Sequence, residues 1–212
     1  MSELSQYWNS YYKDADRVVQ HVPSQFAAFV ASEVTDVGIV LDLGCGSGRD
    51  SIFFTRHFQR VVGVDASESA IQGCVARSIE LGVADRASYI CSDIESTHLA
   101  DSLSDVVAGQ DALIYSRFFL HAISEGAESK LLTMARGLMN SGSVLAVEFR
   151  TGRDAALKKE TPGHFRRYID SALFLQSLAE HGLKVNYFVE GFGYAKYKSD
   201  DAHVARIICT AC

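Results

Sequence analysis

The sequence predicts an α/β fold, with a mainly parallel sheet covered by helices on both faces. Three observations lead to this prediction. Short apolar segments alternate regularly with amphipathic helical segments. The first apolar segment runs into a loop in which every second residue is glycine, at positions 44, 46 and 48. The chain has 212 residues, of which 48% are hydrophobic and 22% charged, a balance that suits one domain with a full core.

Local patterns predict each element in turn. Helical segments at 7–12 and 26–30 lead into the sheet. Apolar or alternating segments predict seven strands, at residues 39–43, 61–65, 87–91, 111–115, 143–149, 184–190 and 204–210. Helical periodicity predicts helices among them, at 50–57, 68–81, 125–138 and 170–181. No helical pattern separates the last two strands, so we expect them to pair as an antiparallel hairpin.

The glycine loop and the next strand predict a ligand. Glycine adopts positive φ at little cost and lets a ligand lie against bare backbone. The strand 61–65 ends in Asp65, 21 positions after Gly44, about where a carboxylate reaches a ribose bound at such a loop. A dinucleotide site requires Gly-x-Gly-x-x-Gly, but here Arg49 occupies the place of the third glycine. The pattern therefore indicates an adenosine-type ligand other than a dinucleotide.

At these residues the chain resembles the class I S-adenosylmethionine (SAM) methyltransferases. Their first motif, acidic-x-Gly-x-Gly-x-Gly, is matched by Asp42, Gly44, Gly46 and Gly48. Further matches follow in the family's order and extend the resemblance over roughly residues 39–150: Val64-Asp65-Ala66-Ser67, Ser92-Asp93-Ile94 and Asp111–Ser116. The resemblance implies a three-layer Rossmann-like fold with strand order 3-2-1-4-5-7-6 and an antiparallel seventh strand. It extends loosely to small-molecule methyltransferases of the thiopurine and tellurite type, from which the chain departs after residue 116.

The resemblance implies SAM as cofactor and assigns residues to it. Asp42 would attract the ammonium group, and the loop from Gly44 would approach the methionine and ribose. Asp65, an acceptor when ionised, would take two ribose hydroxyls. The other implied cofactor contacts are Arg49, Ala66, Asp93, Ile94 and Ser116, although Arg49 could instead pair with an acid at a helix start. Trp8 and Tyr12 share a helix face and are candidates for a lid, or equally for ordinary core.

Cationic residues follow the later strand ends in a chain whose net charge is −6. The candidate acceptor-binding residues are Arg117, His121, Arg150, His164, Arg166, Arg167 and Tyr168. Since a guanidinium matches a carboxylate or phosphate, we expect a small anionic acceptor, methylated at oxygen. Alternatively, the arginines pair with Glu148, Asp170 and Glu190 and fix the loops. His121 and His164 are the candidate catalytic bases, and an acceptor that is already anionic needs no base.

Composition disfavours several other classes of protein. The negative charge argues against nucleic-acid binding. No run of about 18 apolar residues is present, and residues 1–13 do not resemble a signal peptide, so we expect a cytoplasmic protein that is monomeric or homodimeric. Five scattered cysteines disfavour a disulfide framework. Cys209 and Cys212 form a Cys-x-x-Cys pair without the second ligand pair of a zinc site, so we expect no metal.

The favoured function is therefore a SAM-dependent methyltransferase that acts on a small metabolite. We expect one domain over 1–212, with a helical lid at 1–35, a cofactor-binding core at 39–150, and acceptor loops with the hairpin at 151–212. A nicotinamide-dependent oxidoreductase is an alternative, disfavoured by Arg49 and by the lack of a Tyr-x-x-x-Lys pair. A non-catalytic SAM-binding interaction subunit and a SAM-consuming cyclase are the others.

Overall fold

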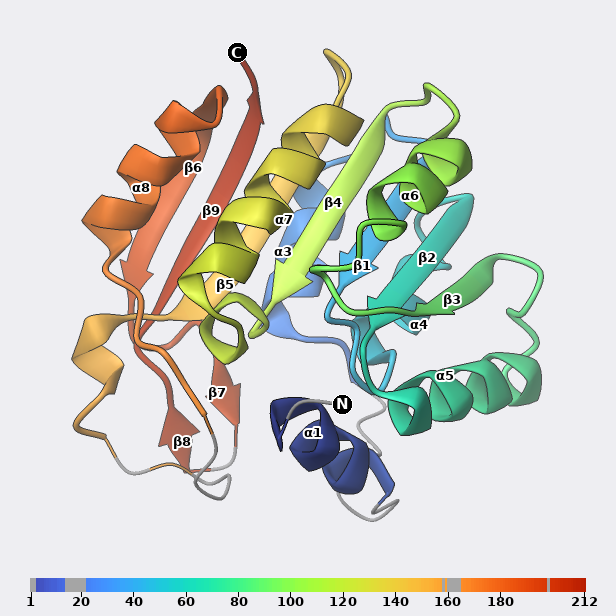
Figure 1. Cartoon of the computed structure of the whole chain (residues 1–212), viewed down its shortest axis with the longest axis horizontal. Coiled ribbons are helices and arrows are strands. Elements are labelled where there is room, and N and C mark those ends of the chain that lie inside the picture. Colours follow the sequence, from blue (N-terminus) through green and yellow to red (C-terminus); the bar gives the residue numbers. More distant parts are fainter. Residues whose placement is uncertain (1–2, 14–21, 158, 160–164, 198) are drawn as a thin grey trace.

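A mixed seven-stranded sheet forms the centre of the computed structural model, which describes residues 3–13, 22–157, 159, 165–197 and 199–212 (Figure 1). Its strands are β1 (Ile39–Leu43), β2 (Arg60–Asp65), β3 (Ala87–Cys91), β4 (Ala112–Arg117), β5 (Val144–Arg150), β6 (Leu183–Gly191) and β9 (Val204–Ala211). The order is β3-β2-β1-β4-β5-β9-β6. β9 runs antiparallel to β5 and β6, while the pairs from β3 to β5 are parallel. The predicted strand order and the antiparallel last strand are confirmed.

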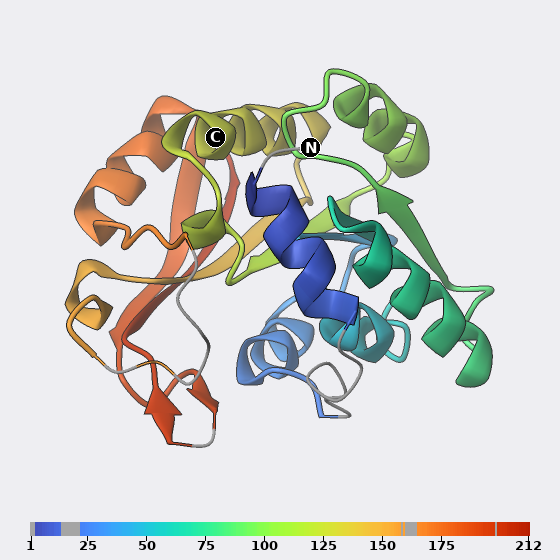
Figure 2. The ribbon, with the colours of Figure 1, turned by 60° about the horizontal axis from the view of Figure 1, so that its bottom comes forward.

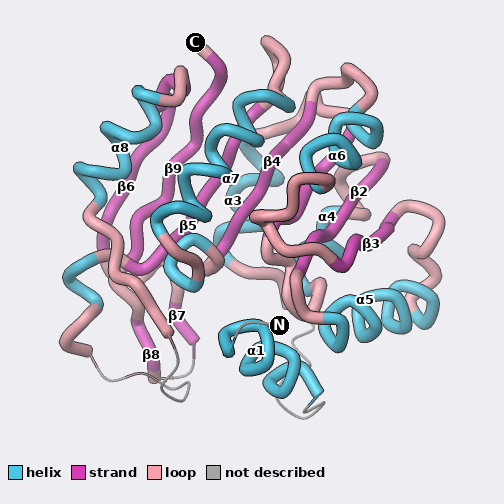
Figure 3. The backbone as a smooth tube through the Cα atoms, in the orientation of Figure 1, coloured by secondary structure: helices cyan, strands magenta, loops and turns pink. Residues whose placement is uncertain are grey.

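Helices cover both faces of this sheet. In chain order, the helices of the described residues are α1 (Glu3–Lys13), α3 (Gln25–Glu33), α4 (Arg49–Phe54), α5 (Glu68–Glu80), α6 (Leu99–Val107), α7 (Glu125–Leu138) and α8 (Ser171–Glu180), with short 3-10 turns at Leu120–Ala122 and Gly152–Asp154. Figure 1 shows α6, α7 and α8 in front of the sheet and α3 behind it. The tube in Figure 3 shows the parallel strands ending at the same edge, beside which α1 lies. This edge is where ligands bind in open α/β sheets.

Polar side chains fix where several helices begin. Each of them lies at an N-cap and accepts hydrogen bonds from amides of the first turn, which would otherwise have no partner. These residues are Ser24 before α3, Ser67 before α5, Ser124 before α7 and Asp170 before α8. The predicted starts of α5, α7 and α8 agree with the structure to within about two residues, the usual scatter of helix ends.

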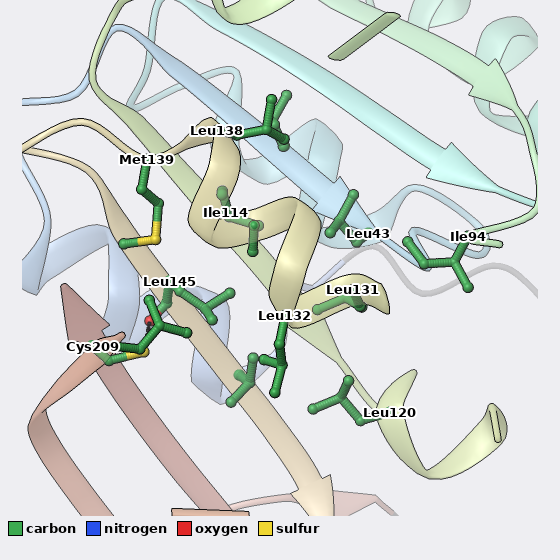
Figure 4. Packing of buried hydrophobic residues seen from close by; sticks show 14 of the residues in the cluster. Leu43, Ile94, Ile114, Leu120, Leu131, Leu132, Leu138, Met139, Leu145 and Cys209 are labelled. Atoms are coloured by element: carbon green, nitrogen blue, oxygen red, sulfur yellow. Dashed lines mark hydrogen bonds between the residues drawn. The ribbon is translucent and has the colours of Figure 1, made fainter. Parts of the chain in front are cut away.

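Two apolar clusters hold the layers together, one on each face of the sheet. The larger joins the sheet to α6, α7 and α8, and Figure 4 shows Leu43, Ile114 and Leu145 of the sheet facing Leu131 and Leu132 of α7. The smaller joins α3 and α4 to β1, β2 and β4. Because both faces are covered, the central strands are apolar on both sides, as their continuous hydrophobic runs predict.

A buried polar network ties the N-terminal layer to the glycine loop. Asp50, in the first turn of α4, accepts hydrogen bonds from Ser24 N at 2.8 Å and Ser24 Oγ at 2.7 Å. Tyr115 Oη of β4 donates to the same carboxylate at 2.9 Å. Burial raises the pKa of Asp50, but the nearby guanidinium groups of Arg117 and Arg49 and the bonds from Ser24 outweigh it and lower the pKa overall. An ionised Asp50 therefore orients α4, and with it the loop that precedes it.

Two parts of the chain differ from the prediction. The helix α6 was not predicted, because its serines and aspartates have weak helix propensity, although Leu99, Leu103 and Val107 repeat every fourth residue and are buried. The segment between the last two predicted strands, for which no further element was predicted, contains a small antiparallel pair, β7 (Lys196–Tyr197) and β8 (Asp200–Asp201). Within the described part of the chain, no helix has the length and apolar composition that a bilayer span requires.

Candidate functional site

The glycine loop has the backbone that its sequence predicts. Gly44, Gly46 and Gly48 have φ values of 75°, 52° and 70°, a region that side chains with a Cβ rarely adopt. The amides of Gly44 and Cys45 donate to Val64 O, at 2.8 Å and 3.0 Å, and so fasten the loop to β2. A Cβ at position 44 would overlap the ring of Phe119, and one at position 46 the hydroxyl of Tyr12. The loop is therefore a bare backbone surface with two aromatic side chains against it.

Asp65 lies beside this loop at the carboxyl end of β2. Its Oδ2 accepts from Gly46 N at 2.9 Å, and its Oδ1 accepts from Ser67 N at 2.9 Å. Burial raises the pKa of Asp65, and the amide hydrogen bonds from Ser67, Gly46 and Ala66 partly counter this effect. A carboxylate has about four acceptor positions, so each oxygen keeps capacity for a further donor. Two neighbouring hydroxyl groups, such as those of a ribose, match that capacity.

Asp42 lies under the loop and is almost fully buried. Ser51 Oγ donates to its Oδ2 at 2.5 Å. Burial raises the pKa of Asp42 to about 7, since the hydrogen bond from Ser51 compensates only in part and the carboxylates of Asp50 and Asp65 raise it further. The site therefore contains a carboxyl group that changes its charge near neutral pH, and a cation bound nearby would stabilise its ionised form.

Helix α1 lies across the carboxyl ends of the parallel strands, next to α5 (Figure 2). On it, the rings of Trp8 and Tyr12 stack with centroids 6.0 Å apart. The hydroxyl of Tyr12 reaches Gly46, and burial together with the charge of Asp65 raises the pKa of Tyr12 well above its usual value. α1 thus packs on α5 and over the glycine loop, instead of lying on a face of the sheet.

The other predicted cofactor contacts fall into two groups. Ala66 and Asp93 are exposed after β2 and β3, where Asp93 Oδ1 accepts from Glu95 N at 2.9 Å. The side chains of the other three make contacts within the protein that stabilise the fold. Ser116 is buried and donates to Leu43 O at 3.1 Å, and Ile94 packs into the larger apolar cluster. Arg49 pairs with Asp50 at 3.3 Å, which agrees with the alternative that the sequence left open for it.

Carboxylates bind most of the candidate acceptor arginines that the structure describes. Arg117 Nε lies 2.7 Å from Glu148 Oε1, as one of the alternatives predicts. The other partners differ from those expected. Arg150 pairs with Asp154 and Asp200, each at 2.7 Å, and Arg167 pairs with Glu128 and donates to the carbonyls of Leu120 and Ile123. The side chain of Arg166 and the ring of Tyr168 are half-buried, and His164 lies outside the described residues.

His121 is buried in the turn after β4. Its Nδ1 accepts from Arg150 N at 3.3 Å, and its carbonyl accepts from Arg167 N at 2.7 Å. A neutral imidazole whose Nδ1 accepts a hydrogen bond carries its proton on Nε2, so no lone pair remains to take a proton from an acceptor. This geometry favours the structural role of His121 over the role of general base.

Four residues of the site region were missed in the sequence. Phe118 has φ of 55°, uncommon for a bulky residue, and its ring lies under two guanidinium groups, 4.2 Å from Arg117 Cζ and 5.2 Å from Arg150 Cζ. No sequence pattern predicts a phenylalanine with positive φ. Phe119 and Asn9 likewise gave no signal. Arg206, the partner of Glu148 on β9, was missed because the register that places the two residues directly opposite does not follow from the sequence.

Comparison with known proteins gives a family match and a set of similar folds. A family model described as a methyltransferase domain matches residues 40–142. No curated protein sequence matches the chain. Among solved structures, the [4+2]-cyclase SpnF is similar, with a TM-score of 0.75 and 15% identity over 98% of this chain and 94% of that one. A SAM-dependent methyltransferase from Anabaena variabilis has a TM-score of 0.71 and 18% identity, over 98% and 93%.

A third structure bears on the tellurite-type resemblance. The TehB-like SAM-dependent methyltransferase from Corynebacterium glutamicum has a TM-score of 0.67 and 14% identity, over 98% of each chain. At such identities the structures show a shared fold, and the similarity to the tellurite type is no stronger than that to the other two.

Proposed function

We propose that the protein is a class I SAM-dependent methyltransferase that transfers the methyl group of SAM to a small organic acceptor, and the methyltransferase-domain model that matches residues 40–142 supports this proposal. One observation carries the proposal beyond the family. The backbone of the glycine loop and the carboxylate of Asp65 adjoin at the carboxyl ends of β1 and β2, joined by the hydrogen bond from Gly46 N. The loop and the carboxylate therefore meet where an adenosine-type ligand would lie.

The residues present fit SAM. Asp65 would hold the ribose hydroxyls, the loop from Gly44 would take the methionine portion, and Asp42 would attract the ammonium group. Ala66 and Asp93 would face the adenine. When bound, SAM supplies a methyl group on a sulfonium, which is already an excellent leaving group. The task left to the chain is to align the acceptor and to exclude water from it.

An acceptor that is anionic and methylated at oxygen stays a prediction. The guanidinium groups of Arg117, Arg150 and Arg167 are bonded to carboxylates, so they offer less to an anion than their number suggests. Arg166 belongs to the same predicted acceptor-binding set, and its side chain is half-buried. A turnover assay of Arg166→Met with a panel of carboxylate and phosphate compounds tests whether the acceptor is anionic. Arg150 is unsuitable for this test because its replacement would remove a charged partner from two buried acids, Asp154 and Asp200. A cytoplasmic location also stays a prediction.

Replacing Asp65 by alanine is expected to weaken SAM binding about thirtyfold. The variant loses two hydrogen bonds from ribose hydroxyls to a charged acceptor, which together contribute about 2 kcal/mol or more. Isothermal titration calorimetry with SAM measures the effect. The matched control is Asp105→Ala, which removes an exposed acid from α6 and should leave the affinity unchanged.

The same titration tests the proposed function itself. Wild-type protein should bind SAM and show no affinity for a nicotinamide dinucleotide; the reverse result would establish the oxidoreductase alternative. SAM binding that persists at full strength in Asp65→Ala would show that the ribose lies elsewhere. Affinity without turnover of any acceptor would instead indicate the non-catalytic SAM-binding subunit.

A further inference from the structure

Asn9 links the aromatic helix α1 to the start of α5. Its Oδ1 accepts two hydrogen bonds, one from Ser67 Oγ at 3.0 Å and one from Ser69 N at 3.1 Å. Because a backbone amide can only donate, the atom that faces Ser69 must be the oxygen of the Asn9 amide and not its nitrogen. Asn9 thus supplies an acceptor to the open amides at the N-terminus of α5.

The contact lies two residues along the chain from Asp65, the proposed cofactor carboxylate. Ser67 N donates to Asp65 Oδ1, and Ser67 Oγ both caps α5 through Ala70 N and donates to Asn9. A continuous chain of hydrogen bonds therefore runs from Asp65 through Ser67 to α1. Three residues further along α1, Tyr12 lies against Gly46, so the helix is fastened at one point and meets the glycine loop at the next turn.

We propose that Asn9 is a positioning residue, whose bonds to α5 hold α1 so that Tyr12 covers the glycine loop, and that this placement strengthens SAM binding. The proposal rests on the proposed function, since it assigns a role to Asn9 in binding the same cofactor. If α1 is in the binding orientation only part of the time, the apparent affinity for SAM equals the intrinsic affinity multiplied by that fraction of time. Loss of both hydrogen bonds is expected to reduce SAM affinity roughly tenfold.

The test uses Asn9→Leu in the full chain, because leucine has a similar size and no acceptor. Trp8 is the only tryptophan of the sequence and lies on α1, so its fluorescence reports the position of this helix. In Asn9→Leu we expect emission of the free protein to shift to longer wavelength and the SAM dissociation constant to rise about tenfold. Ser10→Ala changes an exposed residue of the same helix and is the matched control, expected to behave as wild type.

A double-mutant cycle identifies the route of the effect. If Asn9 acts through Tyr12, Asn9→Leu should weaken binding little further once Tyr12→Ala is present. An equal loss in both backgrounds overturns the proposal, as does an Asn9→Leu variant that binds SAM as well as or better than wild type. These results differ from failure of the proposed function, in which the wild-type protein itself would not bind SAM.

Discussion

Replacing Glu148 by alanine is expected to lower the free energy of unfolding by about 3–5 kcal/mol, a large part of the stability of a typical domain. Glu148 is fully buried on β5, with Arg117 directly opposite on β4 and Arg206 directly opposite on β9. Its two oxygens accept from the Nε atoms of these arginines, at 2.7 Å and 2.6 Å. Alanine would leave two guanidinium groups close together without their shared counter-charge.

Chemical denaturation followed by circular dichroism measures this loss, and the midpoint of thermal unfolding should fall by on the order of 10 °C. Glu95→Ala is the matched control, because Glu95 forms an ion pair with Lys130 at the surface, where we expect an effect below about 1 kcal/mol. A triple variant with methionine at positions 117, 148 and 206 should recover part of the loss, because it removes the three interacting charges together, while Asp50 loses its attraction to Arg117. Equal effects of Glu148→Ala and Glu95→Ala would contradict the conclusion that the buried row Arg117, Glu148 and Arg206 stabilises the fold.

The row Arg117, Glu148 and Arg206 separates what the sequence predicts, the positions of the strands, from what it does not predict, their register. Strand positions follow from apolar runs, and the parallel order of the sheet follows from the resemblance, so the fold was predicted nearly whole. Register is a different property, because it depends on how neighbouring strands slide against one another. The sequence places Arg117 and Arg150 at strand ends, but only the register assigns Glu148 to the first and leaves Asp154 and Asp200 to the second.

The residues of the candidate site that the sequence predicts best are those whose type is required by the backbone conformation of the loop. Glycine at 44, 46 and 48 and an acid at 65 are required by a tight loop beside a strand end, and they adjoin as expected. Side chains that depend on long-range packing were predicted less well. Phe119 lies 75 positions from Gly44 in the sequence, and nothing local indicates that its ring would reach the loop. The contact of Asn9 with the start of α5 was not predicted, because a single asparagine in a helix has many possible partners.

Replacing Asp42 by asparagine is expected to stabilise the protein in alkaline solution and to have little effect in acid. The folded-state pKa of Asp42 is about 7, above the ordinary value of 3.8, because burial disfavours its charged form. Below pH of about 4 the carboxyl is protonated in both states, so it affects stability little. Between about pH 4 and 7 the carboxyl ionises in the unfolded chain but stays protonated in the folded protein, so the free energy of unfolding falls by about 1.4 kcal/mol per pH unit, up to a limit of about 4 kcal/mol.

Urea unfolding of wild type and Asp42→Asn at about pH 5 and about pH 8 measures this difference, which should grow by about 2–3 kcal/mol between the two. Asparagine can still accept the hydrogen bond from Ser51, so the comparison isolates the charge. The same charge is what an ammonium group would bind, and wild-type affinity for SAM should therefore rise between about pH 6 and 7.5 while that of Asp42→Asn stays flat. A stability difference that does not change with pH would mean that Asp42 ionises freely in the folded protein; parallel affinity profiles would remove it from the cofactor site.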